Sequence, residues 1–149
     1  MQAKYVHTNL IAKDWKKLAD FYINIFGCTP VPPERNLHGE AISKGTGIPG
    51  AHIKGMHLRL PGWNDQGPTL EIFAYTPEKD ILETAINRPG FGHIAFQVDD
   101  VNSAQKAVLD AGGHKIGEVV SVPVGQGTVT FCYVSDPEGN AIELQSWSK

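Results

Sequence analysis

The fold is decided by the stretch YVHTNLIAKDWKKLADFYINIFG at residues 5–27, which returns as FGHIAFQVDDVNSAQKAVLDAGG at residues 91–113. Each copy has an aromatic residue two positions before a histidine and an aspartate seven positions after it. The two histidines, His7 and His93, are offset by 86 residues (93 minus 7). An internal repeat of this kind indicates two similar structural halves.

Both copies predict a strand followed by an amphipathic helix. Asp14 and Asp100 stand where a helix N-cap accepts hydrogen bonds from unpaired backbone N–H groups. Gly27 and Gly112 stand where a left-handed residue ends a helix. The predicted helices therefore cover Lys16–Phe26 and Asn102–Ala111.

A second repeated segment lies at the end of each half. GPTLEIFAY at residues 67–75 and GNAIELQSW at residues 139–147 both place a glutamate four positions after a glycine, in an apolar strand. Their offset of 72 (143 minus 71) falls 14 short of 86, so the first half has a longer middle. The candidate insertion is Pro33–Gly55, which predicts a strand pair with an extended loop. Either a plain long hairpin or a substrate lid is compatible with it.

Each half thus predicts a strand, a helix and about three further strands. So few helices cannot cover both faces of a doubly wound parallel sheet, which favours an α+β fold with a mixed, mostly antiparallel sheet and helices on its outer face. We expect one domain, with a first module at about residues 5–76, a linker at 77–90 and a second module at 91–149. The predicted strands are Val6–Ile11, Glu40–Ser43, Lys54–Leu60, Thr69–Tyr75, His93–Val98, Lys115–Val122, Thr128–Ser135 and Ala141–Trp147.

Composition narrows the function classes. The 149 residues carry 13 Lys and Arg against 16 Asp and Glu, and the net charge of −3 argues against nucleic acid as a partner. No stretch reaches the roughly 18 apolar residues of a membrane helix, and charges interrupt the first 25 residues, so we expect a cytoplasmic protein. Cys28 and Cys132 lack metal or redox spacing and are expected to be buried thiols.

Four side chains are candidates for a metal centre. Strand alternation turns His7, Glu71, His93 and Glu143 away from the helices, and they converge if the two modules curl into one cup. Two imidazoles and two carboxylates suit one divalent ion such as Zn, Ni, Co, Mn or Fe(II). Without a cation, two half-buried glutamates would resist ionisation.

Polar and aromatic side chains on the same faces predict contacts to a small-molecule substrate, although an aromatic rim against a second subunit is an equal alternative. These predicted substrate-binding residues are Asn9, Phe73, Tyr75, Phe91, Gln97, Gln145 and Trp147. Arg35, Lys44, Arg59 and Arg88 are candidates for holding anionic groups, with solvated surface charge as the simpler reading. The histidines outside the ligand pattern, His38, His52, His57 and His114, are interpreted as surface or loop residues.

The segments HTNL (7–10), LEIF (70–73), GHIAF (92–96) and DPEGNAIELQSW (136–147) resemble motifs of the vicinal oxygen chelate superfamily. That superfamily includes glyoxalase I, methylmalonyl-CoA epimerase, extradiol dioxygenases and antibiotic-resistance proteins. The resemblance implies two paired βαβββ modules that form a cup around one divalent metal ion, often at the interface of a homodimer.

Within the superfamily, glyoxalase I enzymes present His, Glu, His and Glu in the order of His7, Glu71, His93 and Glu143. The resemblance therefore implies a lyase or isomerase that acts through a metal-bound enediolate on a vicinal-oxygen substrate such as a glutathione hemithioacetal. Ni, Zn or Co is favoured over Mn or Fe, and Glu71 or Glu143 would be the catalytic proton carrier. The alternatives are a methylmalonyl-CoA epimerase-like enzyme, an Fe(II) extradiol dioxygenase and a non-catalytic small-molecule or antibiotic-binding protein.

Overall fold

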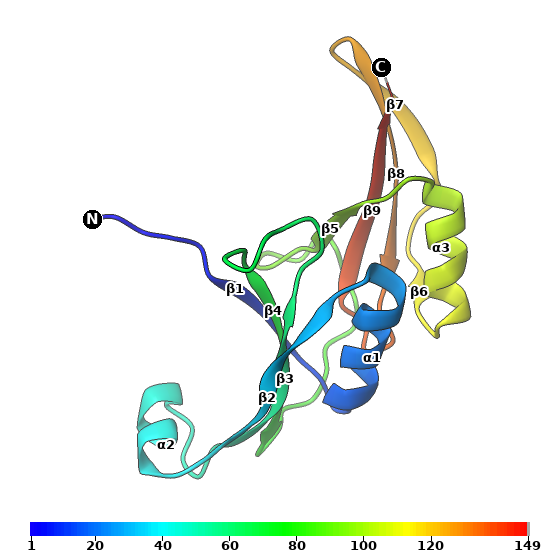
Figure 1. The fold of residues 1–149 in the computed structure, drawn as a ribbon. Helices are drawn as coiled ribbons and strands as arrows, with labels where there is room; N and C mark the ends of the chain where they lie inside the picture. Colours follow the sequence, from blue (N-terminus) through cyan, green and yellow to red (C-terminus); the bar gives the residue numbers. More distant parts are fainter. Residues whose placement is uncertain (149) are drawn as a thin grey trace. The chain divides into compact units, whose positions relative to one another are not determined.

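The computed structural model describes residues 1–148 and divides the chain into two compact units, one over residues 1–81 and the other from residue 82 onward. Each unit is a mixed, mostly antiparallel sheet with a helix packed on one face (Figure 1). The predicted α+β fold class is confirmed.

The first unit contains a four-stranded sheet of order β1-β4-β3-β2, in which β1 runs parallel to β4 and the other neighbours are antiparallel. Its elements are β1 (His7–Ile11), α1 (Trp15–Phe26), β2 (Thr29–Leu37), α2 (Glu40–Thr46), β3 (His52–Arg59) and β4 (Thr69–Thr76).

Helix α1 covers one face of this sheet by packing on β3 and β4. Leu18 and Tyr22 of the helix and Leu58, Leu70 and Ile72 of the strands are almost fully buried there. The helix ends are formed as predicted: Asp14 accepts a hydrogen bond from the Lys17 backbone N–H at 3.1 Å, and Gly27 is left-handed with φ 68°. The opposite face of the sheet is therefore the one without a covering helix.

The second unit repeats this plan, with β5 parallel to β9 in a sheet of order β5-β9-β8-β6 and β7 paired to β8. Helix α3 packs on β8 and β9 and is capped by Asp100, which accepts from the Ser103 backbone N–H at 2.7 Å. The elements are β5 (Ile94–Gln97), α3 (Val101–Asp110), β6 (His114–Lys115), β7 (Val120–Val124), β8 (Gly127–Ser135) and β9 (Ala141–Ser148).

The turn between β8 and β9 is built around the fully buried Asp136. Its carboxylate accepts hydrogen bonds from the backbone N–H groups of Glu138 and Asn140, both at 2.9 Å, and from the Asn140 side chain at 2.8 Å. These bonds hold the DPEGN turn closed and so fix the register in which Tyr133 pairs with Glu143.

The predicted strand at Glu40–Ser43 is wrong, because these residues begin helix α2. Gly39 and Gly47 flank the helix with φ values of 100° and 71°, which only glycine adopts readily. Lys44 pairs with Glu40 one turn away. Figure 1 shows α2 at the tip of the long β2–β3 pair, so the insertion carries a short helix instead of a bare loop.

Two further differences concern strands. Strand β2 was not predicted, and the predicted strand Lys115–Val122 is divided between β6 and β7.

Cys28 and Cys132 are buried and free, as expected. Within residues 1–148, no helix is long and apolar enough to cross a membrane.

Candidate functional site

The site in the first unit is centred on Glu71, which lies on β4 between β1 and β3. The register pairs Glu71 with Asn9 on one side and with His57 on the other. Laterally paired residues of neighbouring strands point to the same face, so all three side chains lie on the face opposite α1. Glu71 is only 7% exposed, which makes it a buried carboxylate on the uncovered face.

Both oxygens of the Glu71 carboxylate have partners. Oε1 lies 3.3 Å from Nδ1 of His7 and 3.0 Å from Nε2 of His57. Oε2 accepts a hydrogen bond from Nδ2 of Asn9 at 3.1 Å. Burial of a charge without such partners would be costly, so this arrangement explains how a glutamate is accommodated at the centre of a sheet.

His57 was interpreted from sequence as a surface or loop residue, and this is wrong. It lies within β3, its side chain is 24% exposed, and it contacts Glu71 directly. Burial is the largest influence on its pKa and lowers it; the Glu71 charge opposes this, while Arg35 and His7 lower it further. The lowered pKa favours the neutral form of this imidazole.

The second unit holds a matching pair. Nε2 of His93 lies 3.0 Å from Oε2 of Glu143, and Tyr133 pairs with Glu143 across β8 and β9. The rings of His93 and Tyr133 meet edge to face with centroids 5.1 Å apart. Burial, and then the negative charge of Glu143, raise the pKa of Tyr133, so its phenol keeps its proton.

The structure thus extends the internal repeat to the neighbouring strands. In each unit a glutamate on the strand beside the edge strand contacts a histidine and faces a ring on the next strand. The corresponding positions are His7 and His93, Glu71 and Glu143, Asn9 and Ala95, and His57 and Tyr133.

The donors suit a divalent metal ion, because imidazole nitrogens and carboxylate oxygens together favour first-row metals such as Zn, Ni and Co. The structure supplies them as one His–Glu pair in each unit. Among residues 1–148, no group of three or more His, Cys, Asp or Glu side chains is arranged to hold an ion by itself.

The predicted substrate-binding residues fall into two sets. The register places Asn9, Phe73 and Tyr75 on the face of Glu71, and Gln97, Gln145 and Trp147 on the face of Glu143. Phe91 precedes β5 and is fully exposed.

The four candidate anion-holding residues have different partners in the structure. Lys44 pairs with Glu40, and Arg88 donates to the Glu83 carbonyl. Arg59 donates to the Asp65 carbonyl at 2.6 Å. Arg35 pairs in register with Gly55, two residues from His57 on the same face, and is the one of the four whose charge acts on that imidazole.

A family profile described as Glyoxalase/Bleomycin resistance protein/Dioxygenase superfamily matches residues 4–144. The chain belongs to this superfamily. A lactoylglutathione lyase of Neisseria meningitidis is 40% identical over 141 residues, covering 95% of this chain and 88% of the relative. A probable lactoylglutathione lyase of Vibrio parahaemolyticus is 30% identical over 144 residues, with the same shares of the two chains covered.

Solved structures of the superfamily share the fold. A glyoxalase family protein from Bacillus cereus matches with a TM-score of 0.72 and 19% identity, covering 100% of this chain and 95% of the other. A fosfomycin resistance protein from Listeria monocytogenes matches with a TM-score of 0.63 and 20% identity, covering 100% and 94%. At these identities, the likeness supports the glyoxalase-superfamily fold and not a particular substrate.

Proposed function

We propose that this protein is a divalent-metal-dependent lyase of the glyoxalase I type, acting on a hemithioacetal formed by glutathione and an α-ketoaldehyde. One observation carries the proposal: each unit presents a His–Glu pair, with atoms 3.3 Å apart for His7 and Glu71 and 3.0 Å apart for His93 and Glu143, at positions related by the repeat. The names of the bacterial relatives favour this reaction over an epimerase, a dioxygenase or a binding protein.

In this proposal, His7, Glu71, His93 and Glu143 together hold one ion, with Ni, Zn or Co favoured and Mn or Fe as alternatives. The ion supplies positive charge that stabilises negative charge developing on the substrate oxygens. The four ligands meet either within one chain or across a homodimer. A protein that sediments as a monomer would leave only the first arrangement.

The chain itself supplies the proton carrier. A glutamate, Glu71 or Glu143, removes the proton from the carbon beside the carbonyl and returns it to the neighbouring carbon. The proton is conserved and no oxidant is consumed, so the reaction is an internal redox isomerisation of the hemithioacetal to a thioester. Asn9 donates a hydrogen bond to Oε2 of Glu71 and so orients the carboxylate.

The substrate surface in this proposal consists of the residues that share a face with either glutamate. Phe73 and Tyr75 on one side and Gln97, Gln145 and Trp147 on the other would contact an organic handle and its polar groups. Phe91 is assigned to the same surface because it is a fully exposed aromatic close to His93 in sequence.

The test is turnover of the glutathione hemithioacetal of methylglyoxal after metal removal by a chelator and reloading with Ni, Co, Zn, Mn or Fe(II). We expect thioester formation only in the reloaded protein, with Ni, Co or Zn most effective. Sedimentation of the same samples would give the expected homodimer. Metal-loaded protein that makes no thioester would overturn the proposal, and consumption of oxygen with Fe(II) and a catechol would favour the dioxygenase.

A further inference from the structure

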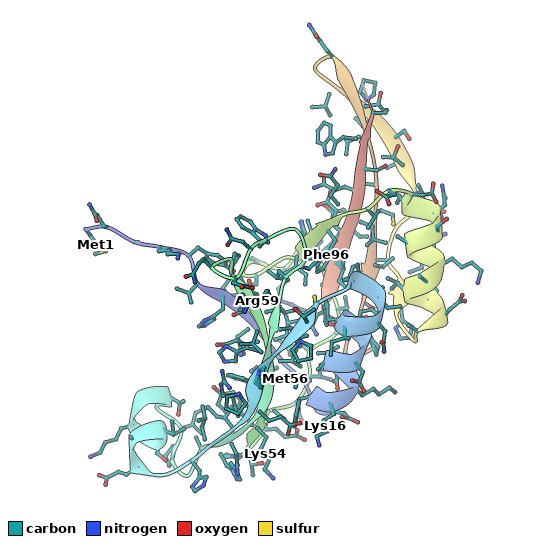
Figure 2. The ribbon with its side chains drawn as sticks, in the orientation of Figure 1. Met1, Lys16, Lys54, Met56, Arg59 and Phe96 are labelled. Atoms are coloured by element: carbon teal, nitrogen blue, oxygen red, sulfur yellow. The ribbon has the colours of Figure 1, made fainter. Side chains whose placement is uncertain are left out.

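His57 is a histidine of the first unit that contacts Glu71 without belonging to the repeated His–Glu pattern. It lies on β3 between Met56 and Arg59, which Figure 2 labels along this strand. Its partner across the strand pair is Glu71, and the two side chains share the face that α1 leaves uncovered. His57 therefore approaches the carboxylate from the side opposite to β1.

The contacting atoms define the role that this imidazole can take. A carboxylate only accepts hydrogen bonds, so a favourable contact at 3.0 Å requires that Nε2 of His57 carries the proton. His7 contacts the same oxygen through Nδ1, at 3.3 Å. The two histidines thus meet one carboxylate oxygen through different ring nitrogens.

The carboxylate needs such support because a glutamate side chain has several rotatable bonds. Asn9 donates to Oε2 from β1, and His57 approaches Oε1 from β3. Removal of His57 would leave one oxygen restrained only by His7, at the longer distance of 3.3 Å. The orientation of the carboxylate would then depend on a residue that is itself assigned as a ligand.

The imidazole of His57 is itself held. Its ring centroid lies 5.7 Å from that of the buried Phe73, and its side chain is only 24% exposed. A restrained ring can restrain its partner, whereas a mobile surface ring cannot.

We propose that His57 is a positioning residue that holds the Glu71 carboxylate in the orientation required for metal binding and proton transfer. This inference rests on the proposed function and assigns a role to a residue outside the four ligands. Groups that hold a ligating carboxylate or imidazole commonly affect metal affinity or activity about 10- to 100-fold when they are removed.

The experiment compares the wild-type full-length chain with His57→Ala, with His57→Gln, which keeps an N–H donor of similar reach, and with His52→Ala. His52 is a matched control on the same strand, at a position of opposite parity and hence on the other face. Ni(II) affinity is measured by competition with a chelator. Long-range ¹H–¹⁵N spectra of the metal-free wild type and of Glu71→Gln report which ring nitrogen of His57 is protonated.

We expect His57→Ala to weaken Ni(II) binding by about 10- to 100-fold, His57→Gln to restore it to within about 3-fold, and His52→Ala to match the wild type. The spectra should show Nε2 protonated, with a resonance that moves in Glu71→Gln. Kinetics of the loaded proteins should show a lower kcat with a smaller change in KM for His57→Ala.

Three results would overturn the inference. His57→Ala could bind Ni(II) as the wild type does, His57 could carry its proton on Nδ1, or His57→Gln could lose as much affinity as His57→Ala, as expected of a direct ligand. In each case an active, metal-loaded wild type leaves the proposed function standing. A wild type that binds no Ni(II) and makes no thioester would instead refute the proposed function, and the positioning role with it.

Discussion

The ring of Phe73 lies over Gly55, so that a Cβ atom at position 55 would meet Cδ1 of Phe73 at 2.5 Å and the carbonyl oxygen of Ile72 at 2.0 Å. Gly55 is buried on β3, paired with Phe73 on β4. The absence of a side chain at this position leaves room for the Phe73 ring, whose centroid lies 5.7 Å from that of His57, and so the glycine belongs to the support of the site.

The substitution Gly55→Ala should destabilise the first unit by about 1–3 kcal/mol, because the added methyl group requires the backbone and Phe73 to shift. Urea unfolding measures the change. Gly45→Ala is the control, because Gly45 lies in α2, where an added Cβ would have no atom within 4 Å, and alanine favours helices. Equal unfolding midpoints for Gly55→Ala and the wild type would show that β3 and β4 accommodate the added methyl group without loss of stability.

The substitution Glu71→Gln should lower kcat by about 10²- to 10⁴-fold, the usual contribution of a general acid–base group, and should affect metal affinity less. The amide keeps an oxygen that can accept from Asn9 but cannot take up the substrate proton. Glu143→Gln is the matched variant in the second unit. A full loss of turnover in Glu143→Gln with normal turnover in Glu71→Gln would assign the proton transfer to Glu143.

The Asp100 cap should make the stability of α3 depend on pH. The hydrogen bonds from Ser103, the backbone one first, hold the pKa of Asp100 below its ordinary value of about 3.9. A lowered pKa in the folded state stabilises the fold above the unfolded-state pKa, and this contribution is lost as the pH falls through the folded-state pKa.

Asp100→Ala should therefore unfold at lower urea than the wild type near neutral pH, and the difference should shrink as the pH falls below about 4. Asp99→Ala, next to the cap and exposed, is the control. A difference that stays constant down to about pH 2 would mean that the carboxylate charge of Asp100 does not contribute.

The two thiols should be unreactive in the folded protein. Burial raises the pKa of Cys28 to about 11 and also raises the pKa of Cys132, and both side chains are almost fully buried. Because the thiolate is the reactive form, a disulfide reagent at about pH 8 should label neither residue until denaturant is added. Rapid labelling of one thiol in the native protein would indicate local opening around it.

The helices and most strands could be predicted because their signals are local. Asp14 and Asp100 precede apolar residues at helical spacing, and both cap their helices in the structure. The alternation around Glu71 and Glu143 placed both residues on the faces away from the helices. Glu71 is nevertheless more buried than alternation implies, because Asn9 and His57 flank it from the neighbouring strands.

Strand β2 was missed because its sequence, TPVPPERNL, contains three prolines. Proline lacks a backbone donor and is confined in sheets to edge strands and bulges. β2 is such an edge strand, and its register shifts between Val31 and Arg35, where two of the prolines lie. Prolines that would disrupt a central strand are therefore tolerated in the edge strand β2.

His57 was missed because a strand pairing depends on register, which local patterns do not fix. The sequence predicted a strand at Lys54–Leu60 but no register for it, whereas the structure pairs residue 57 with Glu71. A shift of one residue turns every side chain to the opposite face. The alternation of Met56, Leu58 and Leu60 turns His57 to the opposite face, but the register that brings it beside Glu71 is not a local signal.

In the proposed function, the pairs His7–Glu71 and His93–Glu143 hold one metal ion between them. Elemental analysis after reloading with Ni(II) and removal of excess metal tests it most directly, on the wild type, His7→Ala and His93→Ala. We predict about one ion per chain in the wild type and far less in either variant, because each removes one ligand of a shared site. A wild type without bound metal, or one with two ions of which each variant keeps one, would contradict the account.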